Sequence, residues 1–452
     1  MVNKENHSTH RPQTVLSSLL ALLVILQFSQ IWLEIGDVTV RSETVLTIVL
    51  LCFVLMPSCI HKPFGSFKTP FTWPVLIWIG MILLGIALTL IQDLSSVLKK
   101  DAFVNGIRLA LAFSTFFVAL QFPLPPRKKI KIILGSIVGF SFITTVVAIL
   151  QIAYSDNWFH FSLPSFLVEH KMGANTAQGR EVFGLNIGDT AAHSFAYFVS
   201  IQAACVFYWF FAEKHFYKKW FGMCYAILLF LIIVRISVRA ATLGSIISLL
   251  GVSLVYPFQQ ERNKKRVLLV VFFWAILIYS GIIFLYEYAP NSYYIKRITE
   301  TIPQFQNKTI KINRGSNIYG RFAYWQFAID SFKQSPIFGN GFYSFNFTNY
   351  RPFGPSILHA HNGYLNTLSE LGLVGLFALF WMLRGAQKTW LKISTYEYND
   401  PVFIASQRIL IWFLCFLLFT SMFANTLYQP QLIGSGCMIL GSFADLFAKG
   451  RH

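Results

Sequence analysis

The stretch His359-Ala-His-Asn-Gly-Tyr-Leu-Asn-Thr-Leu-Ser-Glu-Leu-Gly-Leu-Val-Gly375 joins a long polar segment to an apolar one. Such a junction predicts a water-exposed loop that enters a membrane helix. His361 would lie near the start of that helix, where the positive end of the helix dipole disfavours a charged imidazolium. A neutral imidazole can accept a proton, so His361 is the candidate catalytic base. The competing interpretation is a polar residue that only marks the membrane surface.

The whole chain has the composition of a membrane protein. Of its 452 residues, 55% are hydrophobic, 17% are aromatic and 12% are charged, with a mean hydropathy of +0.55. This composition excludes an ordinary soluble protein. The formal net charge of +18 does not indicate nucleic acid, because Lys and Arg fall in short clusters between apolar runs, as in cytoplasmic loops. All six cysteines lie in apolar segments, so neither a disulfide framework nor a zinc site is expected.

Apolar runs predict about twelve transmembrane helices within a single integral membrane domain that covers residues 1–452. The expected spans are 14–34, 43–60, 71–92, 104–122, 132–154, 191–212, 220–237, 240–257, 267–287, 371–387, 404–424 and 431–448. The pair that flanks Ser237-Val238-Arg239 is joined by a very short link. The expected fold class is an all-α polytopic membrane protein.

Basic clusters set the expected orientation. They fall in alternate short connections, at 127–131, 214–219, 262–266 and 388–392, and in the C-terminal tail. The positive-inside rule places these connections and both termini in the cytoplasm. Two long segments, about 155–190 and 288–370, then face the outside. The first apolar run lacks a small-residue cleavage site, so we expect a retained signal anchor.

The larger outside loop, 288–370, contains the pattern of a surface helix. Its apolar residues recur at spacings of three and four: Phe322, Trp325, Ile329 and Phe332. This spacing predicts an amphipathic helix that lies on the membrane surface or caps the bundle. Pro336, Gly339 and Gly341 then end it.

Basic residues on the outside suggest an anionic ligand, because the positive-inside rule disfavours them there. Guanidinium groups can bind a diphosphate with bidentate geometry, which makes the arginines the stronger candidates. Arg321 begins the amphipathic helix, Arg180 precedes another span, and Arg239 sits between two apolar runs. For Arg239 a structural ion pair is an equal explanation, and Arg235 competes with it. A solvated surface explains three lysines better: Lys296, Lys308 and Lys333.

Outside carboxylates are scattered along the chain: Glu169, Glu181, Asp189, Glu300, Asp330 and Glu370. They form no close-set pair of the kind that holds Mg²⁺. A metal-dependent reaction is therefore disfavoured, and no metal or other cofactor is expected. Glu370 either pairs with a nearby base or marks the membrane interface, and the second interpretation is favoured.

Several motifs together resemble those of the bacterial O-antigen ligase and polymerase superfamily (the Wzy and WaaL type). The first is His361-Asn362, followed after nine residues by Gly372-Leu-Val-Gly375. Arg239-Ala-Ala is similar to that superfamily's Ser-Arg-Gly/Ala-Ala element, with Val238 in place of serine. Arg321, Trp325 and the Pro336-Ile-Phe-Gly-Asn-Gly-Phe run resemble its large periplasmic loop. The segment after Arg180 is a weaker match, because it lacks proline.

The resemblance implies a GT-C-like, metal-independent and inverting glycosyltransferase of the bacterial inner membrane, with its active site facing the periplasm. The donor would be a glycan on undecaprenyl diphosphate, attacked by a sugar hydroxyl. His361 would be the base. Arg239, Arg321 and Arg180 would hold the diphosphate, while Asn362, Gly372 and Gly375 would be structural.

The resemblance leaves the acceptor open. A polymerase of O-antigen or exopolysaccharide repeat units is favoured, because Leu376-Phe377 follow where ligases often have small hydroxyl residues. The alternative is an O-antigen ligase that passes the glycan to lipid A core. A lipid-linked glycan flippase is a third class, disfavoured because few charges apart from Arg108 and Arg235 lie within the spans. Expected partners are the lipid-linked glycan, an acceptor glycan or lipid A core, membrane lipids and a chain-length regulator.

Overall fold

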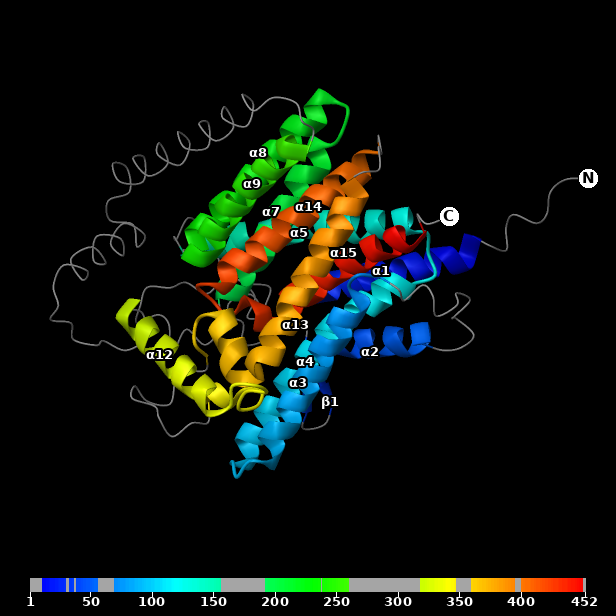
Figure 1. Cartoon of the computed structure of the whole chain (residues 1–452). Coiled ribbons are helices and arrows are strands. Elements are labelled where there is room, and N and C mark those ends of the chain that lie inside the picture. The colour runs from blue at the N-terminus through cyan, green and yellow to red at the C-terminus, as the bar shows by residue number, and fades with distance from the viewer. Residues whose placement is uncertain are drawn as a thin grey trace, which may run out of the picture.

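A computed structural model gives the structure of the chain (Figure 1). It describes residues 10–29, 32–35, 38–55, 69–155, 192–236, 238–259, 318–346, 359–394 and 400–449. Helices make up nearly all of these residues, and one short antiparallel hairpin is present among them.

The first half of the chain forms α1 (His10–Ser29), β1 (Trp32–Ile35), β2 (Val38–Arg41), α2 (Ser42–Leu55), α3 (Thr72–Ile91), α4 (Ser96–Gln121) and α5 (Pro126–Ser155). The second half forms α7 (Ala192–Phe211), α8 (Phe216–Ile236), α9 (Arg239–Gln259), α12 (Ile318–Gln334), the 3₁₀ turn η3 (Ser344–Asn346), α13 (Gly363–Ser394), α14 (Pro401–Ser421), η4 (Thr426–Tyr428) and α15 (Pro430–Lys449).

The predicted fold class is confirmed. Six helices in the described residues are long and apolar enough to cross a membrane: Thr72–Ile91, Ser96–Gln121, Pro126–Leu150, Phe216–Arg235, Gly363–Leu391 and Val402–Ser421. Five shorter apolar helices accompany them. Every predicted span except 267–287, which lies outside the described residues, corresponds to one of the observed helices. The pair around Ser237-Val238 is indeed two helices, α8 and α9.

The first predicted span, 14–34, was wrong at its end. Helix α1 stops at Ser29, and Trp32–Ile35 forms a strand that pairs with Val38–Arg41 in the register Trp32↔Arg41. The strands contain Ile35, Val38, Thr39 and Val40, and β-branched residues favour extended backbone. The hairpin therefore ends at Arg41, and α2 begins at the next residue, Ser42.

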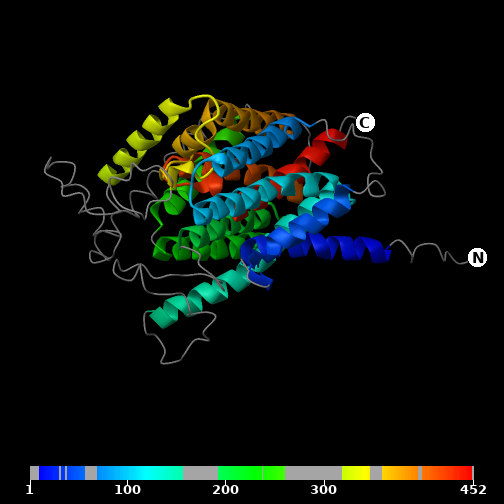
Figure 2. The same cartoon turned by 90° about the horizontal axis from the view of Figure 1, so that it is seen from below.

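Helix α15 forms the centre of the bundle. Its residues 432–445 are all buried, and it packs against α1, α4, α5, α7, α13 and α14. Figure 2 shows this helix (red) beside helices from the first half of the chain (blue and cyan). A Cβ at Gly441 would clash with the carbonyl oxygen of Phe116, so α15 and α4 approach closely. Small residues at such contacts are typical of membrane bundles.

A buried ion pair joins three helices at one end of this core. Lys129 Nζ on α5 lies 2.6 Å from Asp445 Oδ2 on α15, and their side chains are 0% and 2% exposed. The same ammonium donates to the carbonyls of Ala119 and Leu120 at 2.7 and 3.1 Å. These carbonyls belong to the last turn of α4, where no further turn of helix supplies donors. Lys129 thus fixes α4, α5 and α15 to one another.

Candidate active site

Helix α13 is broken at Gly372. This residue has φ 65° and ψ −163°, whereas the residues on both sides are helical. After the break, the amides of Leu373 and Val374 donate to the carbonyls of Pro336 and Ile337 at 2.9 and 3.2 Å, so backbone from outside the helix replaces its own acceptors. A Cβ at Gly372 would clash with the carbonyl of Ile337. The chain therefore requires glycine at position 372, the first glycine of the predicted motif.

The segment that follows α12, residues 335–346, crosses this break, and we call it the crossover segment. The amide of Asn340 donates to the carbonyl of Ser369 in α13 at 3.0 Å. The amide of Phe342 donates to the carbonyl of Gly85 in α3 at 2.9 Å. Gln92, just after α3, donates to the carbonyl of Asn340 at 2.7 Å. The crossover segment therefore fixes α12 and the first turns of α13 to the rigid bundle.

Helix α12 caps the bundle end by packing on α13, as Figure 1 shows. Its buried face consists of Tyr324, Ala328 and Ser331, which are 6%, 1% and 3% exposed. The predicted apolar stripe is not this face, since Phe322 and Ile329 are 52% and 36% exposed. Ala328 and Ser331 allow close packing on α13, while Phe322 and Ile329 stay exposed.

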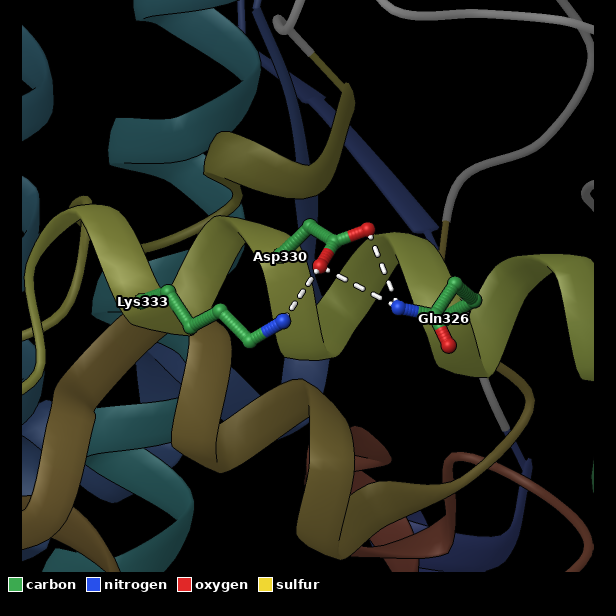
Figure 3. Close-up of polar contacts among 3 residues, drawn as sticks. All are labelled: Gln326, Asp330 and Lys333. Atoms are coloured by element: carbon green, nitrogen blue, oxygen red, sulfur yellow. Dashed lines mark hydrogen bonds and ion pairs between the residues drawn. The ribbon is translucent and has the colours of Figure 1, made fainter.

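The outer edge of α12 carries a surface polar cluster (Figure 3). Asp330 accepts hydrogen bonds from Lys333 at 2.9 Å and from Gln326 at 3.1 Å. The Lys333 ammonium, followed by the Gln326 amide, lowers the pKa of Asp330. Lys333 thus belongs to a solvated face, in agreement with the sequence interpretation.

His361 lies two residues before α13, as predicted, and has a left-handed backbone with φ 52°. The Asn362 side chain caps the helix, because its Oδ1 accepts from the amides of Tyr364 and Leu365 at 3.0 and 3.1 Å. The amide of Gly363 donates to Ala424 after α14 at 3.2 Å. A left-handed histidine is uncommon and is tolerated only where surrounding contacts hold it.

Two histidines and residues from α12 meet at this point. The rings of His359 and His361 are in edge contact, with centroids 4.4 Å apart and planes at 82°. The ring of Tyr324 lies 6.2 Å from that of His361. Arg321, one turn earlier in α12, interacts electrostatically with His359 and with Tyr197 of α7. The structure therefore places the predicted Arg321 within electrostatic range of His359.

His359 was not singled out from the sequence, although its spacing from His361 could have indicated it. Desolvation of the imidazole, and to a lesser extent the charge of Arg321, lowers the pKa of His359. Its buried Nδ1 has no hydrogen-bond partner within the described residues. The same holds for four further buried atoms on the neighbouring elements: Trp325 Nε1, Tyr197 Oη, Asn425 Oδ1 and Gln429 Oε1. Buried polar atoms without partners are costly, so this end of the bundle suits a polar ligand.

Two residues that contact the first turns of α13, Asn366 and Tyr428, were also missed. Asn366 Oδ1 accepts from the amide of Ala360 at 3.2 Å, which holds the turn between the histidines. Tyr428 lies 3.5 Å from Thr367 and also interacts with Asn366 and Glu370. Desolvation, followed by the Glu370 carboxyl, raises the pKa of Tyr428. Glu370 is 1% exposed, so it does not mark the membrane surface as the sequence suggested.

The remaining predicted residues are placed less fully. Arg239 is the first residue of α9, which packs on α14, the helix that leads to the Ala424–Gly363 contact. Its backbone thus begins α9, while its side chain lies outside the described part. Arg180 also lies outside the described residues.

A Cβ at Gly375 would clash with the Leu371 side chain. In the described ranges no three His, Cys, Asp or Glu side chains are grouped as they would be around a metal ion.

The lowered pKa of His359 predicts an acid-sensitive fold. As the pH falls below about 6.5, the unfolded chain binds a proton at this residue while the folded protein does not. Stability is therefore lost as the pH falls from about 6.5 toward the lower folded pKa. His359→Gln should reduce the fall in thermal unfolding temperature between pH 7.5 and 5.5. His215→Gln, an exposed residue between α7 and α8, is the control, and an equal effect of both variants would contradict the assignment.

The fold and this site define a polytopic helical membrane protein with a cationic, histidine-containing site at one end of its bundle. Residues 224–380 match the model of the family described as O-antigen ligase (Wzy_C). The match contains Arg239, Arg321 and His361, and it confirms the predicted relation to the O-antigen ligase and polymerase superfamily. No curated protein matches the chain significantly. The match supports a role in glycan transfer during O-antigen processing.

Proposed function

We propose that the chain polymerises glycan repeat units on the periplasmic face of the bacterial inner membrane, with both termini in the cytoplasm. The donor is a glycan on undecaprenyl diphosphate, and the acceptor is a sugar hydroxyl of another lipid-linked glycan. The observation that carries this proposal is the position of Arg321 and Tyr324 of α12 beside His359 and His361 at the start of α13.

This arrangement suits a direct displacement. The acceptor oxygen forms a bond to the first sugar carbon of the donor, and the bond from that carbon to the diphosphate oxygen breaks. His361 takes the proton of the acceptor hydroxyl, and the electron pair leaves with the diphosphate. Arg321, together with Arg239 and Arg180, stabilises the departing negative charge. One displacement inverts the sugar carbon, and the arginines supply the positive charge in place of a metal.

His359 holds the ring of His361, the proposed base, in position. Its edge contact with His361 restricts rotation of that ring. Because its own pKa is lowered, His359 remains neutral near pH 7 and does not oppose protonation of His361 during the reaction. The hydrogen bond from the Ala360 amide to Asn366 Oδ1 keeps the two histidine rings in this edge contact.

Ligation to lipid A core is the second candidate, because the matched family is described as O-antigen ligase. Both reactions use the same donor and the same leaving group, and they differ only in the acceptor. The residues Leu376-Phe377 after the glycine motif favour the polymerase.

Incubation of the full-length protein in lipid nanodiscs with a lipid-linked repeat unit alone tests the proposal. A ladder of longer glycans on gel electrophoresis is expected, because donor and acceptor are then the same molecule. Product that forms only after addition of lipid A core would replace the polymerase by the ligase. Absence of product with either acceptor would reject glycan transfer altogether.

A further inference from the structure

A buried tyrosine of α7 lies at the histidine end of the bundle. Tyr197 is 1% exposed, and its ring contacts the ring of Phe416 in α14 edge to face, with centroids 6.0 Å apart. Phe416 stands in the last turns of α14, from which the chain continues to Ala424. The carbonyl of Ala424 accepts from the amide of Gly363, the first residue of α13. Tyr197 is thus held beside the helix that leads to the histidine turn.

The first turns of α9 approach the same aromatic contact. A Cβ at Gly244 would lie 3.2 Å from the Phe416 ring and would clash with the methyl group of Thr420. Arg239, the first residue of α9, precedes Gly244 by five residues, or about 8 Å along the helix axis. Tyr197 and the start of α9 therefore meet at one ring, that of Phe416.

Arg321 of α12 links Tyr197 to the histidine turn by its charge. Its guanidinium is within electrostatic range of both the Tyr197 hydroxyl and the His359 imidazole. Tyr197 Oη and His359 Nδ1 are both buried, and neither has a hydrogen-bond partner in the part of the chain that the structure describes. A buried hydroxyl that has given up its bonds to water without replacing them is costly. The Tyr197 hydroxyl therefore suits a bond to a ligand.

The surroundings of this hydroxyl favour an anionic ligand. A phenolic hydroxyl is protonated near neutral pH and can donate to a charged oxygen. The nearby guanidinium of Arg321 attracts negative charge to the same place and binds phosphate oxygens well. A neutral sugar hydroxyl gains less from that charge than a phosphate oxygen does. Tyr197 and Arg321 together thus suit a phosphate group.

We propose that the Tyr197 hydroxyl donates a hydrogen bond to the diphosphate of the lipid-linked donor. This inference rests on the proposed glycan transfer, and it holds for either acceptor, because polymerase and ligase share this leaving group. Tyr197 keeps its own proton throughout. When the bond from the sugar carbon to the diphosphate oxygen breaks, negative charge grows on the diphosphate. The hydrogen bond from Tyr197 therefore strengthens in the transition state and raises the rate.

The rival explanation is a structural hydroxyl that stabilises the free protein, and removal of one oxygen separates the two. Tyr197→Phe keeps the ring and its contact with Phe416. A structural hydroxyl bonds within the folded protein, so its loss lowers the unfolding temperature together with the activity. A hydroxyl that serves the substrate is an unsatisfied polar group in the free protein, so its loss leaves the unfolding temperature equal or higher while activity falls. The two explanations thus predict opposite signs for stability.

The release of undecaprenyl diphosphate by the full-length protein in nanodiscs provides the first test. Tyr197→Phe should lower kcat about ten- to hundredfold, the usual effect of one hydrogen bond to a charged group. Its unfolding temperature should not fall. A wild-type rate in this variant, or a fall in unfolding temperature that accompanies the loss of activity, would overturn the proposal.

The matched control is Tyr208→Phe in the same helix. Tyr208 is also buried, at 4% exposed, and lies about three turns later in α7, near Arg408 of α14. The same atom is removed from the same residue type, but far from Arg321 along the helix. Tyr208→Phe should keep the wild-type kcat. An equal loss in both variants would show that any buried tyrosine of α7 has this effect and would overturn the proposal.

Binding of farnesyl diphosphate, a short prenyl diphosphate, distinguishes failure of this proposal from failure of the proposed function. Isothermal titration calorimetry should show that Tyr197→Phe weakens its binding about tenfold, while Tyr208→Phe does not. Farnesol, which lacks the diphosphate, should bind all three proteins alike. Weaker diphosphate binding in Tyr197→Phe without any transfer by the wild type would reject glycan transfer but retain the contact. Transfer by the wild type, with farnesyl diphosphate bound equally by both proteins or by neither, would retain glycan transfer and overturn the role of Tyr197.

Discussion

Replacement of His361 by alanine is expected to lower the rate of glycan transfer by about 10²–10⁴-fold, the usual contribution of a general base. The neighbouring His359 is not expected to take over the proton, because its Nδ1 is buried. Donor binding should persist, since the arginines remain. The measurement is the initial rate of ladder formation at saturating substrate.

A second variant tests whether His361→Ala loses activity only because its structure is disturbed. His361 has a positive φ, which alanine adopts with strain but asparagine tolerates. His361→Asn should therefore keep the wild-type unfolding temperature and still lack activity. His215→Ala, in the exposed turn between α7 and α8, should retain full activity. A rate for His361→Asn within a few-fold of wild type would remove this histidine from the chemistry.

Gly372→Ala is expected to destabilise the folded protein by about 3 kcal/mol or more. The positive φ alone costs about 1–3 kcal/mol for a residue with a side chain. The new Cβ also clashes with the Ile337 carbonyl, which is fixed by the amide of Val374. Denaturant unfolding in detergent measures the change, together with the amount of folded protein in the membrane.

The matched control for this change is Gly139→Ala in α5, where a Cβ would meet nothing within 4 Å. That variant should be neutral or slightly more stable, by up to about 1 kcal/mol, because alanine favours helix. If Gly372→Ala were as stable as Gly139→Ala, the break in α13 would not depend on the glycine. Loss of activity without loss of stability would indicate a role in the site itself.

The helices were predictable because each span must bury its own backbone in lipid, which requires a long apolar run. This local requirement is visible in the sequence even for α8 and α9, which only two residues separate. The hairpin at 32–41 was missed because its first residues, Trp32 and Leu33, extend the preceding apolar run. Hydropathy does not distinguish a strand from the end of a helix.

The site was only partly predictable, because its parts come from segments far apart in the chain. His361, Asn362 and Gly372 share one short motif and were found. Which face of α12 packs on α13 depends on contacts that the helical period does not specify. The roles of Asn366 and Tyr428 arise from the turn after α14, some sixty residues beyond the motif.

The break at Gly372 also sets the fit of this protein to its bilayer. An unbroken α13 of 32 residues would be about 48 Å long, far beyond the ~30 Å hydrocarbon core. The part after the break, residues 373–391, is about 28 Å long and matches that thickness. The preceding turns, which carry Asn366 and Glu370, therefore need not fit within the thickness of the hydrocarbon core. We expect changes in membrane thickness to be met by tilt of the later part, while the crossover segment holds the histidine site to the bundle.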